Sequence, residues 1–489
     1  MKYFLAIDEG TSSTRAILYD TQGRLCVKSQ YSLTQSCPAP GYVEQDAEEI
    51  WQKTCFAIRD VVAKINPVDI LACGITNQRE TTVIWDKRTG ECVGPVISWQ
   101  DQRTESICSA YSAADISDIH QKTGLRMNAY FSATKLHWLL KNMPKAKKLA
   151  QKGLLAFGTI DSFLLWRLTK GSQHLTDITN ASRTLLFNLV DKTWDETLLD
   201  LFEIPSAILP EVQSNDAYFG MMHKEIMGKE IPIHAMIGDQ QSALLGQACI
   251  RPGMMKATYG SGAFLLMNIG KEPVWSRHQL LTTVAYQVQH QTVFGLEGSI
   301  YHAGTILRWL RDGLGILPNV VDSERMAQMV TDNAGVYLVP SFTGLGAPYW
   351  LQTPGASYVG LTTTTTANHL VRAALEAIVF QTKDILECML ADYPGKLTSL
   401  RVDGGVTQNT WLLHYLASVC QIMVKRTDEM ETTAKGAAML AAIASGHLSS
   451  LNDLQTHWHC NLICRPERRQ KSYRKAYEGW CRTLEKISR

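Results

Sequence analysis

The stretch that decides the fold is residues 3–19, YFLAIDEGTSSTRAILY. An apolar run ends at Asp8, a polar turn around Gly10 follows, and a second apolar run covers Ala16–Tyr19. Short apolar runs bounded by turn residues are typical of buried strands. The sequence therefore predicts a strand pair with Gly10 in its turn, which a third strand over Leu25–Leu33 extends.

Helical patterns follow these strands. Asp46 with Glu49 resembles a capping box, and the apolar residues after it recur at a helical period. Ile70–Ile75 is a further buried strand, and Asn368 is expected to cap a long helix in the second half. Strands that alternate with helices in this way indicate α/β architecture.

The second half repeats the pattern of the first. Residues 255–267, MKATYGSGAFLLM, again read as strand, glycine turn and strand, like residues 4–19. Such self-similarity suggests an internal duplication. The pattern breaks near residues 246–254, which predicts one domain over residues 1–250 and another over residues 251–489.

Composition and charge indicate which broad classes of protein this chain does not resemble. The chain has 489 residues, a net charge of +2 and no block of like charge, so no nucleic-acid or membrane-surface patch is indicated. No run approaches the ~18 apolar residues of a membrane helix, and the first apolar run stops at Asp8, too early for a signal peptide. Twelve irregularly spaced cysteines are typical of free thiols in a reducing compartment. We therefore expect a cytoplasmic protein.

Three segments share one sequence pattern, in which an apolar strand is followed by an acid and a glycine turn. They are residues 7–11, 237–241 and 402–405. Glycine lets backbone N–H groups approach phosphate oxygens. A carboxylate at a strand end can hold Mg²⁺ through water or take the proton of an attacking hydroxyl. One such turn is more often an ordinary tight turn, but several at corresponding places indicate phosphate transfer. Neither a P-loop nor a dinucleotide-binding GxGxxG after the first strand is present.

A family resemblance covers essentially the whole chain, in order. The strings that carry it are DEGTSSTR (8–15), GYVEQDAEEIW (41–51), GITNQRETTVIWD (74–86), YFSATKLHWLL (130–140), TDITNASRTLLFN (176–188), GDQQSALLGQ (238–247), TYGSGAFLLMN (258–268), FTGLGAPYW (342–350) and RVDGG (401–405). They resemble the glycerol kinases within the FGGY family of carbohydrate kinases. The resemblance implies two actin-like, ribonuclease H-like ATPase lobes with an interlobe cleft. It also implies ATP-dependent phosphorylation of glycerol to sn-glycerol 3-phosphate.

The resemblance also implies a substrate site. The positions that match hydroxyl-binding residues are Arg79, Glu80, Tyr130, Asp239 and Gln240, and those that match apolar walls are Trp99 and Phe264. Asp239 matches the catalytic base. Without the resemblance, Arg79 and Glu80 would be interpreted as a surface pair at a strand end, and the two aromatic residues as core.

The nucleotide side is implied in the same way. Matching positions around the phosphates are Thr11, Ser12, Ser13, Arg15 and Ser261, and those near the adenosine are Gly304, Arg308, Gly405 and Asn409. Asp8, through water, and Asp239 match the positions that hold Mg²⁺. The expected partners are glycerol and ATP or ADP, in a homodimer or homotetramer.

The chain departs from the family pattern at several positions: Glu9 for Gln, Ser261 for Thr, Arg308 for Gln, Ala129 for Pro, and the altered loop Leu351–Gly355. Glu9 is expected to put an extra negative charge beside the phosphates, so that Glu9→Gln would tighten ATP binding. Two other functions stay open, a kinase of a larger polyol or ketose and a non-catalytic nucleotide-dependent binding protein.

Overall fold

The predicted strand pair at the start of the chain is confirmed by the computed structural model, which describes residues 1–351, 355–467 and 470–487. Strand β1 (Tyr3–Glu9) pairs antiparallel with β2 (Ser13–Asp20), and the Gly10 N–H closes the turn on the Ser13 carbonyl over 2.9 Å. The third strand, β3 (Leu25–Ser32), pairs antiparallel with β2.

The first sheet has six strands in the order β13-β14-β5-β1-β2-β3. Strands β5 (Ile70–Asn77) and β14 (Ile231–Gly238) run parallel to β1, and β13 (Gly220–Met222) closes the edge antiparallel to β14. Parallel strands covered on both faces are rich in apolar residues along their whole length. The sequence of β5, ILACGITN, fits this rule, because nearly all of its residues are buried.

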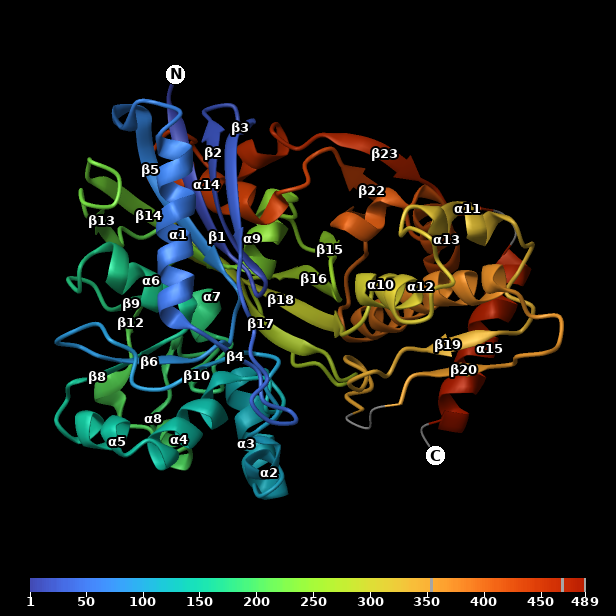
Figure 1. The fold of residues 1–489 in the computed structure, drawn as a ribbon, viewed down its shortest axis with the longest axis horizontal. Helices are drawn as coiled ribbons and strands as arrows, with labels where there is room; N and C mark the ends of the chain where they lie inside the picture. Colours follow the sequence, from blue (N-terminus) through green and yellow to red (C-terminus); the bar gives the residue numbers. More distant parts are fainter. Residues whose placement is uncertain (352–354, 468–469, 488–489) are drawn as a thin grey trace.

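The second sheet repeats the arrangement of the first. Its seven strands, in the order β17-β18-β16-β15-β21-β22-β23, are β17 (Leu281–Val288), β18 (Gln291–Ile300), β16 (Ala263–Gly270), β15 (Met255–Tyr259), β21 (Leu400–Asp403), β22 (Val424–Thr427) and β23 (Cys460–Cys464). Three antiparallel strands, β18-β16-β15, are followed by β21 and β22, parallel to β15. This is the pattern of β3-β2-β1-β5-β14, as the internal duplication predicts. The predicted α/β class with two lobes is confirmed (Figure 1).

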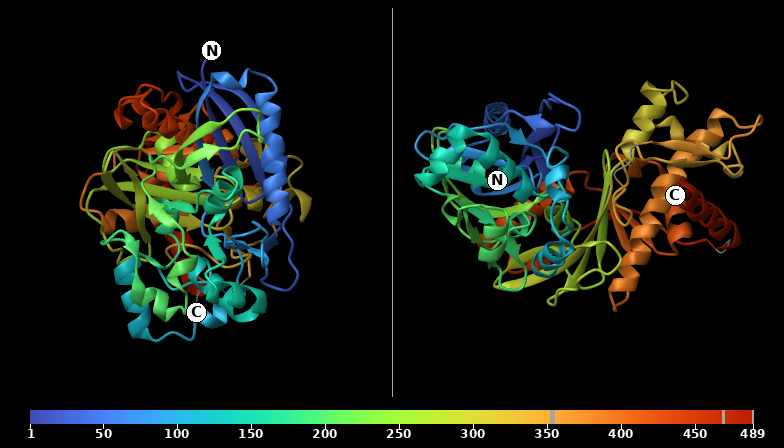
Figure 2. Two further views of the ribbon diagram at one scale, coloured as in Figure 1. Left: turned by 90° about the vertical axis from the view of Figure 1, so that its left-hand side faces the viewer. Right: turned by 90° about the horizontal axis from the view of Figure 1, so that it is seen from below.

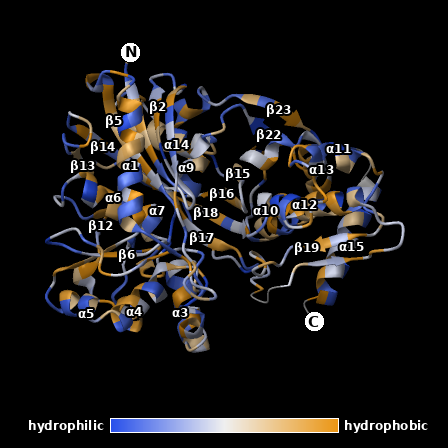
Figure 3. Cartoon of the chain, viewed as in Figure 1, coloured by the Kyte–Doolittle hydropathy of each residue, from blue (hydrophilic) through white to orange (hydrophobic). Residues whose placement is uncertain are grey.

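Helices cover both sheets. Helix α1 (Ala47–Val62) lies on one face of the first sheet, and Figure 3 shows hydrophilic and hydrophobic residues alternating along it. Helices α12 (Ala367–Asp392) and α13 (Thr410–Cys420) pack against each other beside the second sheet, with α15 (Gln470–Ile487) against both. Seen from below, the strands of the second sheet lie between the first half of the chain and these helices (Figure 2).

Two predicted helix caps have different outcomes. Asp46 caps α1 by accepting from the N–H groups of Glu48 and Glu49. The carboxylate of Glu49 bonds to Thr34 and pairs with Lys53, so a reciprocal capping box is not what forms.

The prediction that Asn368 caps the long helix is wrong. Helix α12 begins one residue earlier, and Thr366 caps it together with His369. Thr366 is the last residue of the five-threonine run, and the rest of that run forms the exposed loop before the helix.

One helix of the second half packs on the first sheet. Helix α14 (Thr432–Ala444) contacts β1, β5 and β14 and crosses α9 (Asp239–Gly246), so its ribbon lies among the N-terminal strands in Figure 1. Small residues permit the approach, because a Cβ at Gly246 would lie 1.9 Å from the Thr432 carbonyl oxygen, and one at Gly436 1.9 Å from that of Ser242. This close crossing packs the middle and the end of α9 against the second half of the chain.

Smaller elements fill the segment between β5 and β14. They include β6 (Val83–Asp86), β7 (Val96–Ile97), α3 (Ala113–Thr123), α4 (Ser132–Asn142), α5 (Pro144–Gln151), β8 (Leu155–Gly158), α6 (Ile160–Leu168), β9 (Leu175–Asp177), α7 (Ile178–Ala181) and α8 (Glu196–Leu201). Of the helices in the described residues, none has the length and apolar character that crossing a membrane requires.

Candidate active site

The centre of the site is an ion pair between the ends of two parallel strands. Strands β5 and β14 are neighbours, with Gly238 opposite Asn77, so the residues that follow them emerge at one edge of the sheet. Arg79 Nε lies 3.1 Å from Oδ1 of Asp239, the first residue of α9. The Gln240 backbone N–H donates to the same oxygen over 2.7 Å, and its Nε2 donates to Oδ2 over 2.9 Å. Both oxygens of Asp239 are therefore held in fixed directions, while its side chain keeps 26% exposure.

The neighbouring Glu80 is buried and conformationally constrained. Its φ is 61°, a left-handed value that is uncommon outside glycine. Ser132 Oγ and Thr82 Oγ1 donate to its carbonyl over 2.9 and 3.1 Å and hold this backbone in place. Arg183 Nε donates to its Oε1 over 2.6 Å. Arg79 is buried as well, so interpreting Arg79 and Glu80 as a surface pair would be wrong.

Aromatic rings form one side of the site. The Trp99 ring lies edge-on to Tyr130 at 5.5 Å between centroids and edge-on to Phe264 at 6.0 Å. The Arg79 guanidinium lies 5.9 Å from the Phe264 ring centre. The predicted polar residues and the predicted walls are thus brought together, with Phe264 supplied by β16 of the second sheet.

The first glycine turn lies next to this wall. Thr11 Oγ1 accepts a hydrogen bond from Trp99 Nε1 over 2.8 Å. Ser12 is exposed at the tip of the turn, and Ser13 begins β2. Thr11 and Ser12, which are predicted to bind the phosphates, therefore lie in the turn that contacts Trp99 of the predicted apolar wall.

Asp8 and Arg15 face each other across the hairpin. Arg15 Nη1 lies 3.0 Å from Asp8 Oδ2 and 3.3 Å from Glu431 Oε2, just before α14. Burial raises the pKa of Asp8 to about 6, and the carboxylates of Glu431 and Asp239 add to this effect while Arg15 opposes it. The negative charges of Glu431 and Asp239 thus add to the cost of ionising the buried Asp8 carboxyl.

Glu9 does not face the phosphate turn. Its side chain is fully buried, and Gln78 Nε2 lies 3.2 Å from both of its carboxyl oxygens. Burial raises the pKa of Glu9 well above its ordinary value, and the charges of Asp8 and Asp239 raise it further. The hydrogen bond from Gln78 opposes this shift, and the expected effect of a Glu9 charge on ATP binding stays a prediction.

The second glycine turn joins β15 to β16 and lies against α10 (Gly304–Asp312). Arg308 Nη2 donates to Ser261 Oγ over 2.8 Å, so two of the departures from the family pattern bond to each other. The Gly304 N–H donates to the Gly260 carbonyl over 3.0 Å, and a Cβ at Gly304 would lie 2.6 Å from that oxygen. Glycine is required here because the helix begins directly on the turn.

The remaining adenosine-side residues lie at the end of β21. Gly404 has φ 91°, which turns the chain sharply after Asp403. A Cβ at the next residue, Gly405, would meet nothing within 4 Å, so this backbone borders open space. Asn409 caps α13 by accepting from the Leu412 N–H, and its Nδ2 donates to Ser323 Oγ over 3.2 Å.

Comparison with known proteins identifies the family. The model of the N-terminal domain of the FGGY family of carbohydrate kinases matches residues 3–246, and that of the C-terminal domain matches residues 255–445. The chain belongs to the FGGY family of carbohydrate kinases.

Relatives of this FGGY kinase are similar along its whole length. It is 46% identical over 488 residues to a glycerol kinase of Coxiella burnetii, with 99% of this chain and 97% of the relative covered. It is 45% identical to glycerol kinase 1 of Pseudomonas aeruginosa, with 99% of both covered. A crystal structure of Plasmodium falciparum glycerol kinase with ADP superposes with a TM-score of 0.92 at 34% identity, over 99% of this chain and 98% of that one.

A xylulose kinase from Lactobacillus acidophilus superposes almost as well on this FGGY kinase, with a TM-score of 0.90. It covers 100% of this chain and 99% of its own at only 21% identity. At that identity the likeness concerns the fold alone.

Three charged residues at the site of this FGGY kinase were not selected from the sequence: Arg183, Glu297 and Lys256. All three are fully buried. Lys256 Nζ donates to Gln240 Oε1 and, over 3.1 Å, to Thr258 Oγ1, and burial lowers its pKa to about 8. Arg183 lies inside the family string of residues 176–188, which was its only sequence signal.

Asp403, the acid of the third glycine turn, has a structural role. The Asp403 carboxylate accepts from Gln247 Nε2 over 2.5 Å and from Thr432 Oγ1 over 2.9 Å, and it is buried. It therefore ties α14 to the end of α9, away from open space.

The altered loop after Trp350 is described only in part, since residues 352–354 lie outside the described residues.

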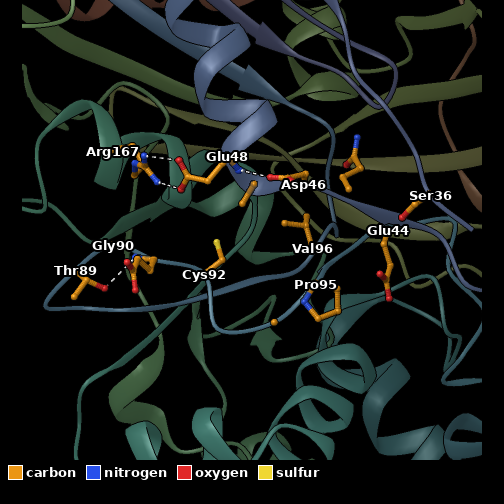
Figure 4. Close-up of a pocket in the computed structure, with 14 residues that line it drawn as sticks. Ser36, Glu44, Asp46, Glu48, Thr89, Gly90, Cys92, Pro95, Val96 and Arg167 are labelled. Atoms are coloured by element: carbon orange, nitrogen blue, oxygen red, sulfur yellow. Dashed lines mark hydrogen bonds and ion pairs between the residues drawn. The ribbon is translucent and has the colours of Figure 1, made fainter. Parts of the chain in front are cut away.

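A pocket in the N-terminal half is lined by none of the predicted site residues. It is open and polar, with the Glu48–Arg167 pair at one side and Glu44 and Pro95 at the other (Figure 4). Two of its carboxylates already have partners in the fold, because Glu44 pairs with Arg103 and Asp46 caps α1.

Proposed function

We propose that this protein is a glycerol kinase, which transfers the γ-phosphoryl group of ATP to a terminal hydroxyl of glycerol and yields sn-glycerol 3-phosphate in glycerol catabolism. The observation that supports this most is the Arg79–Asp239 pair, which lies beside the wall of Trp99 and Phe264. A small triol needs donors and an acceptor on one side and an apolar surface on the other. The similarity over the full length to glycerol kinases supports the same choice.

Asp239 is proposed as the general base. Its carboxylate is held by Arg79 and Gln240 and is still partly accessible, which suits a group that must take a proton from a substrate hydroxyl. As that hydroxyl oxygen bonds to the γ-phosphorus, the bond from phosphorus to the bridging oxygen breaks and ADP leaves. The hydroxyl proton passes to Asp239. Most of the barrier reduction in such transfers comes from positioning and charge neutralisation.

The residues present suit Mg²⁺. Asp8 and Asp239 offer carboxylate oxygens, the donors that Mg²⁺ prefers, and the charge of Asp239 adds to the cost of ionising Asp8. We propose that Asp8, through water, and Asp239 hold the ion, which neutralises charge on the phosphates when it is bound. Arg15 would keep the Asp8 carboxylate in place.

The nucleotide is proposed to lie between the two glycine turns. Its phosphates would meet the hydroxyl and charged groups assigned from the family, Thr11, Ser12, Ser13, Arg15 and Ser261, and its adenosine Gly304, Arg308, Gly405 and Asn409. The open space beside Gly405 supports this direction. So does the likeness to a glycerol kinase whose crystal structure contains ADP.

Other properties are proposed from the sequence pattern and the family. They are a cytoplasmic location, a homodimer or homotetramer, and two lobes over residues 1–250 and 251–489. Because α14 contacts the first sheet, the second lobe would contribute one helix to the first.

The test of the proposed function is a substrate panel. ADP release from MgATP is measured with glycerol, dihydroxyacetone, erythritol and xylulose. We expect glycerol to give the highest kcat/KM. Turnover with xylulose or erythritol but not with glycerol would move the assignment to another polyol or ketose. No turnover with any of them would favour a nucleotide-dependent binding protein.

A further inference from the structure

Two fully buried charges lie behind the proposed substrate residues. Glu297 is on β18 of the second sheet, and Arg183 follows α7 in the first half of the chain. Burying a charge is costly unless it is paired and hydrogen-bonded. Each is ion-paired with a proposed substrate residue and with the other member of the pair, whereas Nη1 and Nη2 of Arg183 make no hydrogen bond within the described residues.

Both carboxylate oxygens of Glu297 accept hydrogen bonds from the Arg79 guanidinium. Its Oε2 lies 2.6 Å from Arg79 Nη1 and its Oε1 3.0 Å from Nη2. A two-point contact of this kind fixes the plane of the guanidinium. Arg79 is thereby oriented so that its remaining Nε faces Asp239.

Arg183 connects the same glutamate to Glu80. Its Nη2 lies 3.0 Å from Glu297 Oε1, and its Nε donates to Glu80 Oε1 over 2.6 Å. Its guanidinium also lies 5.8 Å from the Tyr130 ring centre and 5.4 Å from that of Phe131. Four buried charged residues, Glu80, Arg183, Glu297 and Arg79, therefore form a continuous series of ion pairs that ends at the partly exposed Asp239.

One acceptor atom in this series of charged side chains takes no part in the ion pairs. Among the described residues, no hydrogen bond uses Glu80 Oε2, whereas Oε1 is taken by Arg183. Burial raises the pKa of Glu80, and the charges of Arg183 and Arg79 oppose this. Burial would also raise the pKa of Glu297, but the same two arginines hold it below its ordinary value, so Glu297 is ionised.

We propose that Arg183 and Glu297 are positioning residues that set the spacing between the donor Arg79 and the acceptor Glu80, and thereby the selectivity for a substrate with a hydroxyl on each of three neighbouring carbons. Glu297 comes from the second sheet, whereas Arg79, Glu80 and Arg183 come from the first half. The substrate site is therefore aligned by a contact between the two halves of the chain. This inference rests on the proposed function, because it assigns roles within that site.

The test uses Glu297→Gln and Arg183→Lys. Glutamine keeps the size of Glu297 but can accept with only one atom, and lysine keeps the charge of Arg183 but lacks its fork. Removing one partner of a buried charge pair is expected to raise the KM for glycerol at least about tenfold. We expect the KM for ATP to stay within about twofold, since no contact of either residue involves the nucleotide side.

A second readout separates positioning from general destabilisation. Propane-1,2-diol lacks one terminal hydroxyl, so a well-aligned site rejects it by leaving a polar group unpaired. In both variants the ratio of kcat/KM for glycerol to that for propane-1,2-diol is expected to fall at least about tenfold. Glu297→Asp keeps the carboxylate and should recover part of the ratio, and it carries the test together with Arg183→Lys if Glu297→Gln does not fold.

The matched control is Glu376→Gln. Glu376 is also a buried glutamate, with Arg372 Nε 2.9 Å from its Oε1, but it lies on α12 among the helices of the second half. It should lower Tm without changing the glycerol KM or the substrate ratio. The proposal is overturned if Glu297→Gln and Arg183→Lys match Glu376→Gln in KM and ratio. An absence of glycerol turnover in the wild type would instead contradict the proposed function.

Discussion

Arg79 Nε lies 3.1 Å from Asp239 Oδ1, and these two residues follow neighbouring parallel strands. Parallel strands deliver the residues at their carboxyl ends to one edge of a sheet, which is where α/β proteins bind ligands. The pair therefore exists because β5 and β14 are adjacent. It brings a donor for substrate hydroxyls and a carboxylate to the same point.

Shortening the wall of the site should weaken glycerol binding. In Phe264→Ala the ring that packs edge-on to Trp99 is lost, and we expect the KM for glycerol to rise about tenfold with a smaller change in kcat. Erythritol should become a better competitor because the site is wider. Steady-state kinetics checks this, with the exposed Phe56→Ala on α1 as the control. Equal effects of the two variants would remove Phe264 from the site.

Replacing Glu9 should have little effect on ATP. The carboxyl group of Glu9 is buried and accepts from Gln78 Nε2 at both oxygens, and within the described residues its side chain makes no hydrogen bond to the first glycine turn. A neutral glutamine can keep the contact by accepting from Gln78 Nε2. We expect Glu9→Gln to change the KM for MgATP by less than about threefold. A tenfold tighter KM would restore the interpretation of Glu9 as a charge beside the phosphates.

A methyl group at the crossing of α9 and α14 should reduce both stability and turnover. The added Cβ of Gly246→Ala would lie 1.9 Å from the Thr432 carbonyl oxygen, so the helices must separate. Overpacking of this kind costs roughly 1–3 kcal/mol. Because α9 begins with Asp239, its shift should lower kcat as well. Urea unfolding and initial rates measure the two effects, and unchanged values of both would refute the close crossing.

Stability should depend on pH through Asp384. This α12 carboxyl accepts from Tyr477 and Trp480 of α15 over 2.6 and 2.9 Å, and burial raises its pKa to about 6. A raised pKa in the folded state gives stability that is fully present below the unfolded pKa, 3.8, and is lost as the pH rises through 6.

Asp384→Asn cannot ionise, so the free energy of unfolding of the wild type relative to this variant should fall between about pH 5 and about pH 7.5. Denaturant unfolding at both pH values gives this difference. A difference that is constant or that increases with pH would contradict the assignment.

Local patterns predicted the parts of the fold that local interactions determine. The first strand pair follows from apolar runs on each side of Gly10, and its repeat around Gly260 follows from the same pattern. The cap of α12 was missed because Thr366 and Asn368 are both good caps two residues apart. Sequence alone does not decide which of the two side chains meets the first N–H groups.

The proposed substrate residues were predicted only through the family resemblance, because their local signals are weak. Arg183 and Glu297 show what this route misses. Glu297 lies 218 residues from Arg79 and stands in an ordinary glycine-containing strand, so nothing near it in the sequence marks its partner. Contacts between sheets create such pairs, and only the folded chain reveals them.

The most direct test of the account is ADP release from MgATP by Asp239→Asn, with glycerol binding measured separately by calorimetry. Asparagine keeps the shape of the side chain and one acceptor oxygen, which can still accept from the Gln240 backbone N–H, but it cannot take the proton. We predict that glycerol-dependent kcat falls about 100-fold or more while glycerol still binds, since general-base catalysis contributes this much. Turnover at the wild-type rate would contradict Asp239 as the base and with it the proposed site.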